Sequence, residues 1–272
     1  MTKEALVFFL CGAVIAVAGQ PQIDNHRRQA SAAHIRRLST ALRTGQWLSN
    51  SGTAKRQELT RQLQGAIDQY LQVAFSGPRP DAPAVRTALD DLLLNHRFEK
   101  GYGGPPFVKV EGTGTVEQRL FVAYALKRGN QALDDPAVAL RAYANVDDTL
   151  SLVAATGEDL DGFSLFVLDI PAPVSGESWF LCYGYQAGNG PHRRRVRIYA
   201  FGGGHFRTVW RPDDELEDVL DGADVSVTGS AIKIHRLDPD RYYRTLKAPF
   251  HVITEYLIQP DGILKVNSTP ID

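Results

Sequence analysis

The spacing of apolar residues changes at residues 101–106, and this change constrains the fold more than any other feature. The segment reads Gly-Tyr-Gly-Gly-Pro-Pro, and Gly and Pro interrupt both helices and strand ladders. Before it, apolar residues recur at helical spacing, and after it they fall in short alternating runs. The sequence therefore predicts a helical segment at 19–100, a linker at 101–106 and a β-rich domain at 107–272.

Three amphipathic helices are expected before the linker. The first has its apolar face within Ile35–Leu42, and the second has a longer face within Leu59–Ala74. Asp81 can cap a third helix that carries Pro83 in its first turn. Helices of this kind pack together or lie on a larger body, and their residues indicate no chemistry.

About twelve short strands are expected after the linker, separated by turn residues such as Asp261-Gly262. Their regular spacing is typical of an antiparallel sandwich, a barrel or a stack of propeller-like sheets. Twelve strands supply only three four-stranded blades, which are too few for a closed propeller. The predicted fold is α+β, with a mainly antiparallel β domain that is sandwich-like or partial propeller-like. The expected strands are 107–110, 119–126, 138–143, 150–155, 163–170, 179–185, 196–201, 205–210, 225–227, 231–234, 252–258 and 263–266.

The first 18 residues have the features of an export signal. Lys3 precedes an uncharged run from Ala5 to Ala18, and Ala16-Val17-Ala18 forms a small-x-small cleavage pattern. A membrane-spanning helix needs about 20 apolar residues, so the run is short for an uncleaved anchor, which is the alternative. We expect a secreted or periplasmic protein that begins near Gly19 and has no membrane contact after cleavage. The mature chain then keeps one cysteine, Cys182, which excludes an intrachain disulfide.

Charge is distributed unevenly along the chain. Residues 20–80 carry nine Lys or Arg against three Asp or Glu, and residues 81–272 carry 20 against 27. The basic helical part can therefore attract the acidic domain or an anionic surface. Nucleic acid is not an expected partner, because no aromatic-basic fold signature accompanies the charge.

No motif in the chain supports a catalytic, metal or cofactor assignment. Phosphate-binding loops, nucleophile elbows and zinc-ligand spacings are absent from the sequence. Ser230-Ala-Ile-Lys233 matches S-x-x-K, but its surroundings alternate as in a β-hairpin, so we interpret the match as chance. Glu158–Gly162 contains part of a calcium-loop pattern and is interpreted as a polar connection. Three histidines, which nothing in the sequence brings together, lie in the β-rich part: His205, His235 and His251.

A cluster of arginines gives the one candidate ligand site. If Gly202–Gly204 forms a three-residue turn, Tyr199 pairs with Arg207 and Ala200 with Phe206. One face is then apolar, with Val196, Ile198, Ala200, Phe206, Thr208 and Trp210, and the other holds Arg195, Arg197, Arg207 and Arg211 around Tyr199. Guanidinium groups placed in this way bind carboxylate, phosphate or sulfate. Alternatively, the acidic run 213–221 folds back and neutralises them.

These patterns favour an exported, non-catalytic binding or interaction module whose partner is an anionic ligand, a polymer or a protein. Two alternatives stay open at this point. One is a secreted hydrolase with a site assembled from dispersed residues. The other is a subunit that docks through its N-terminal helices.

Overall fold

The computed structural model describes residues 25–45, 50–77, 80–97, 103–112, 118–129, 136–186, 193–211, 225–237 and 251–271. The expected export signal at 1–18 and the acidic run at 213–221 lie outside these residues. No helix in the described part of the chain is both long enough and apolar enough to cross a membrane.

The helical segment contains three α-helices, as the apolar spacing predicts. The first covers residues 25–44, α2 covers Asn50–Phe75 and α3 covers Ala82–Leu92, followed by the short 3-10 helix η1 at Leu94–His96. Asp81 is the N-cap of α3, because its carboxylate accepts a hydrogen bond from the Ala84 amide at 3.3 Å. The predicted capping role of Asp81 is therefore confirmed.

Within the described residues, twelve strands form three antiparallel sheets, each built from four consecutive strands in chain order. All twelve expected strands are present. Sheet A contains β1 (Phe107–Glu111), β2 (Gln118–Leu126), β3 (Ala137–Val146) and β4 (Thr149–Thr156). Sheet B contains β5 (Phe166–Ile170), β6 (Ser178–Gln186), β7 (Arg193–Gly202) and β8 (His205–Trp210). Sheet C contains β9 (Val225–Thr228), β10 (Ala231–Leu237), β11 (His251–Gln259) and β12 (Gly262–Ile271).

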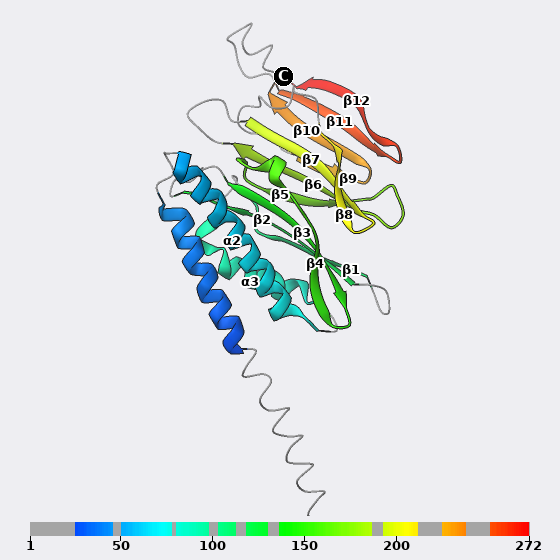
Figure 1. Ribbon diagram of the computed structural model, residues 1–272. Helices are drawn as coiled ribbons and strands as arrows, with labels where there is room; N and C mark the ends of the chain where they lie inside the picture. Colours follow the sequence, from blue (N-terminus) through cyan, green and yellow to red (C-terminus); the bar gives the residue numbers. More distant parts are fainter. Residues whose placement is uncertain are drawn as a thin grey trace, which may run out of the picture.

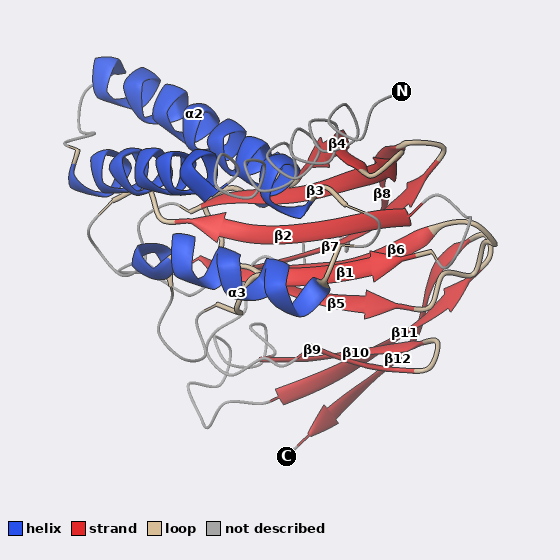
Figure 2. Ribbon diagram, turned by 90° about the horizontal axis from the view of Figure 1, so that it is seen from below, coloured by secondary structure: helices blue, strands red, loops and turns tan. Residues whose placement is uncertain are grey.

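The helices and the three sheets are stacked as layers (Figures 1 and 2). One apolar cluster joins the helices to sheet A, a second joins sheet A to sheet B, and a third joins sheet B to sheet C. Sheet B is therefore the middle sheet, covered on both faces. The fold is α+β with a mainly antiparallel β domain, and its sheets do not close into a barrel.

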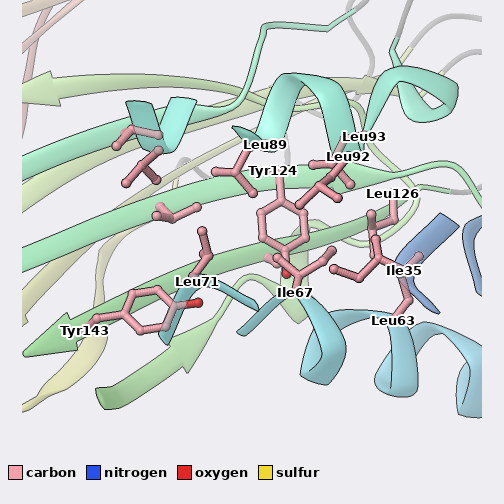
Figure 3. Close-up of a cluster of buried hydrophobic side chains, with 14 of the residues drawn as sticks. Ile35, Leu63, Ile67, Leu71, Leu89, Leu92, Leu93, Tyr124, Leu126 and Tyr143 are labelled. Atoms are coloured by element: carbon pink, nitrogen blue, oxygen red, sulfur yellow. The ribbon is translucent and has the colours of Figure 1, made fainter. Parts of the chain in front are cut away.

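The helices and sheet A share one core, although the Gly/Pro linker separates them in sequence. Figure 3 shows the Tyr124 ring of β2 between Leu89 and Leu92 of α3 on one side and Ile67 of α2 on the other. The described part of the linker is also held in place, because the Gly104 amide donates a hydrogen bond to the Leu165 carbonyl at 2.8 Å. Apolar burial thus binds the helical segment to the first sheet.

The two covered faces of sheet B explain the environment of Cys182 on β6. Its side chain is buried in the cluster between sheets A and B, and burial raises the pKa of its thiol. The thiolate is the reactive form of cysteine, so this side chain behaves as a small apolar group.

The predicted register of the β7–β8 hairpin is wrong. Gly202 pairs with His205, so the turn has two residues, Gly203 and Gly204, and both have positive φ. That is the geometry of a type I′ turn, which suits the twist of a hairpin. Ala200 consequently pairs with Arg207 and Phe201 with Phe206, while a register shift next to Ile198 pairs that residue with Trp210.

The corrected register changes which hairpin residues share a face. Val196, Ile198 and Ala200 face sheet C together with Trp210, as expected. Phe206, however, packs toward sheet A, where its ring centroid lies 6.5 Å from that of Phe121 of β2. The observed register therefore places Phe206 in aromatic packing between sheets A and B, which the alternation of the strands did not predict.

Candidate functional site

The candidate site is built around η2, a single 3-10 turn at Glu158–Leu160 that connects sheet A to sheet B. Gly157 precedes it with φ of 115°, and a Cβ atom there would lie 3.1 Å from the Val138 carbonyl oxygen. Only glycine fits this combination of left-handed backbone and close approach. The turn places Asp159 beside β7.

Three of the five predicted site residues converge on Asp159. The Tyr199 hydroxyl donates a hydrogen bond to its carboxylate, and Arg197 Nε lies 3.4 Å from its other oxygen. Arg195 Nη1 donates to the Asp159 carbonyl at 2.7 Å. Burial, followed by the neighbouring carboxylate, raises the pKa of Tyr199, so its hydroxyl stays protonated and acts as a donor.

The other two predicted residues lie apart from this cluster. Arg207 forms a salt bridge with Glu177 at 2.7 Å, and Glu177 also accepts a hydrogen bond from Trp179 at 2.8 Å. Arg211 lies exposed directly after β8. The five residues therefore do not form one patch on a sheet face, because the two-residue turn moves Arg207 to the Ala200 side.

Asp161, two residues after Asp159, points to different partners. Its carboxylate accepts hydrogen bonds from Arg128 at 3.0 Å and from the Val138 amide at 2.8 Å. Asp159 and Asp161 therefore pair with different arginines, Arg197 and Arg128. Within the described ranges, no group of three or more His, Cys, Asp or Glu side chains is placed to hold a metal.

Three adjoining hollows lie along η2, and we call them together the η2 groove. The first, of about 250 Å³, lies against α2 and is lined by Gln57, Thr60, Arg61, Gln64, Arg128, Ala137, Val138, Glu158 and Asp161. The second, of about 450 Å³, is lined by Gln64, Val138, Arg141, Ala155, Thr156, Glu158, Asp159 and Thr208. The third, of about 380 Å³, is lined by Asp159, Arg197, Thr208, Val209, Trp210 and Arg211. Shared lining residues show that the hollows are neighbours.

A buried polar cluster lies beside the middle hollow, and sequence reasoning missed it. Arg141 of β3 is 8% exposed, and its Nε lies 3.4 Å from an Asp68 carboxylate oxygen of α2. The Tyr143 hydroxyl donates to the same oxygen at 2.5 Å. Burial raises the pKa of Asp68, and the opposing effect of Arg141 only partly offsets it. The sequence signal for this cluster was Arg141, a charged residue within the apolar run of β3.

A separate hollow of about 360 Å³ lies between α3, η1 and the linker, and His96 is part of its lining. Ser39 Oγ lies 2.7 Å from His96 Nε2, a distance typical of a nucleophile-base pair. Ser39 is only 1% exposed and does not line the hollow, so a substrate has no access to its hydroxyl. This pair therefore gives little support to a hydrolytic site.

The remaining sequence candidates are located as follows. Ser230 lies in the turn before β10, and Lys233 on that strand pairs with Glu255 at 2.6 Å, which confirms the hairpin interpretation of the S-x-x-K match. His205 is exposed at the start of β8, whereas the rings of His235 and His251 lie in contact.

The fold and the groove together define a layered α+β protein with an arginine-lined surface. No protein-family model matches the sequence, and comparison with curated proteins and with solved structures also found no match. The function is therefore inferred from the groove itself.

Proposed function

We propose that the protein is an exported, non-catalytic binding module whose η2 groove binds an anionic polymer. The observation that carries the proposal is the arginine content of the groove lining. Five arginines line it, at positions 61, 128, 141, 197 and 211. The first four pair with Glu58, Asp161, Asp68 and Asp159, respectively, and Arg211 is exposed directly after β8. Arginine binds carboxylate and sulfate groups through two parallel hydrogen bonds, which favours an acidic ligand.

The shape of the groove favours a polymer over a single small anion. Three adjoining hollows can accept successive units of a chain. The third hollow brings Arg197 and Arg211 together at one end of the groove. Two neighbouring guanidinium groups suit an acidic polysaccharide, because they can bind the acid groups of successive sugars. The expected export signal supports a ligand outside the cytoplasm.

The alternative of docking through the N-terminal helices has less support. The apolar faces of these helices pack on sheet A, in the cluster that also contains Tyr124 and Tyr143. A docking subunit would be expected to present such a face to its partner.

Retention on immobilised heparin and on immobilised polygalacturonate tests the proposal. The parent chain is expected to bind at low salt and to elute in a salt gradient. Arg211→Ala should elute at lower salt, because it removes an exposed cation of the third hollow. Arg207→Ala is the matched control, since it removes an exposed arginine of β8, the strand that Arg211 follows, and Arg207 pairs with Glu177 outside the groove.

Two outcomes would contradict the proposal. In one, the parent chain passes through both columns without retention. In the other, Arg207→Ala and Arg211→Ala shift elution equally, which would mean that net charge alone governs retention. Arg197→Ala is less useful, because its side chain is only 12% exposed and its loss disturbs the packing around Asp159.

The export part of the proposal has a separate test. Intact-mass measurement on protein from its native compartment should give a chain that begins near Gly19. A chain that retains Met1 and sediments with membranes would show an uncleaved anchor instead.

A further inference from the structure

His235 of β10 and His251 of β11 form a cross-strand pair that takes no part in the η2 groove. In the antiparallel register, His235 pairs with Ile253, so His251 is its diagonal neighbour. Long side chains at diagonal positions of a sheet reach each other. The two imidazole centroids are 4.8 Å apart, and the ring planes are inclined by 43°.

The pair lies on the face of sheet C that points away from sheet B. Ile232, Ile234 and Tyr256 pack into the cluster between the two sheets. His235 and His251 occupy the alternate positions of the same strands, and side chains alternate between the two faces. His235 Nε2 is nevertheless buried, and it has no hydrogen-bond partner in the described part of the chain. Such an atom is expected to have a partner.

We propose that His235 and His251 chelate a divalent transition-metal ion, with Cu²⁺ preferred over Ni²⁺ and Zn²⁺. Imidazole nitrogen is a preferred ligand of all three ions, and Cu²⁺ is bound most tightly by nitrogen sites of a given geometry. Metal–nitrogen distances of about 2 Å place two imidazole nitrogens on one ion at most about 4 Å apart. Rotation of two rings whose centroids are 4.8 Å apart can bring one nitrogen of each within this distance.

The remaining coordination positions would go to water. Two protein ligands form a weaker site than the closed four-ligand sites of structural zinc. Protons compete with the metal for the same nitrogens, so binding should weaken as the pH falls. The proposal does not depend on the η2 groove, and either can fail without the other.

Calorimetric titration of the metal-free chain with Cu²⁺ tests the pair. We expect one saturable equivalent that His235→Gln and His251→Gln each weaken at least ten-fold. His205→Gln is the matched control, because this histidine is exposed on β8 of sheet B, and its Nδ1 lies 3.2 Å from the Gly203 carbonyl oxygen. The electron paramagnetic resonance spectrum should show two imidazole nitrogens on this Cu²⁺ in the parent chain and fewer in each of the first two variants.

Circular dichroism will establish that each variant is folded before it is titrated. The proposal is overturned if the parent chain shows no saturable binding, or if His205→Gln weakens binding as much as the other two. It is also overturned if only one of His235 and His251 contributes, because a chelate requires both rings.

Discussion

Tyr199 of the middle sheet donates a hydrogen bond to Asp159, a residue forty positions earlier in the turn between sheets A and B. The tyrosine is buried, whereas the Asp159 side chain is 43% exposed. The carboxylate at the protein surface therefore accepts the hydrogen bond of a buried hydroxyl and forms an ion pair with Arg197. This arrangement connects the stability of sheet B to the lining of the η2 groove.

Replacement of Asp159 tests this connection. Asp159→Ala is expected to lower the free energy of unfolding by about 2 kcal/mol, because it removes the acceptor of the buried Tyr199 hydroxyl and the carboxylate beside Arg197. Asp159→Asn should cost less, since its amide oxygen still accepts a hydrogen bond. Urea denaturation measures both changes, and Glu158→Ala, a change at an exposed neighbour, should stay within about 0.5 kcal/mol of the parent. Equal stabilities for all four proteins would contradict the role of Asp159.

His96 should make stability depend on pH in the mildly acidic range. Burial, followed by the charge of Arg43, lowers the pKa of His96 from 6.5 to about 4. Between these values the unfolded chain binds a proton that the native chain does not, so stability falls as the pH falls from 6.5 to 4. Between pH 6.5 and 4, protonation linked to this residue lowers the free energy of unfolding by about 3 kcal/mol. In His96→Gln the contribution should vanish, so the difference from the parent, measured by urea denaturation at several pH values, isolates it.

Two glycines are expected to respond in opposite ways to replacement by alanine. At Gly184 of β6, a Cβ atom would lie 1.6 Å from the Ser164 carbonyl oxygen, so the two segments must separate. Gly184→Ala should lower the free energy of unfolding by about 3 kcal/mol or more. Gly65 lies inside α2 with no atom within 4 Å of such a Cβ, and Gly65→Ala should add up to about 1 kcal/mol. Thermal denaturation compares them, and a stable Gly184→Ala would contradict the close approach.

Cleavage in the linker at 101–106 should not release the helices. The helices and sheet A share a core that includes Ile67, Leu89 and Tyr124, and this burial persists after the backbone is cut. After mild proteolysis, the helical and β-rich fragments should elute together from a gel-filtration column and separate only in denaturant. Free β-rich fragment under native conditions would show that the segments are independent domains.

The elements could be predicted from the sequence because their signals are local. The helical stripes and alternating runs predict the α-helices and strands that the described residues contain, and Asp81 was identified as a cap from its place before Pro83. The hairpin turn could not be predicted in the same way. A three-residue turn and a two-residue turn with a register shift both give a plausible alternation of apolar and polar side chains. The choice between them depends on the contact of Phe206 with Phe121, a residue of another sheet.

The site was predicted only in part for the same reason. Arg195, Arg197 and Tyr199 alternate on one strand, so their common location follows from β periodicity. Their partner Asp159 and the buried pair of Asp68 with Arg141 come from distant segments. Glu158–Gly162 looked like a connection, and its sequence does not reveal that it lies against β7. Only the stacking of the layers brings these groups together.

The sequential order of the strands has a consequence for how the chain folds as it is made. Each ladder joins neighbouring strands, so every sheet can form without waiting for a distant segment, and the loops to be closed are short. The contacts between layers come later, because they require two finished sheets. A nascent chain that ends after β8 would still expose the Trp179, Leu181 and Ile198 side chains that sheet C covers. Until β9–β12 emerge, this face is the part of the molecule most prone to aggregate.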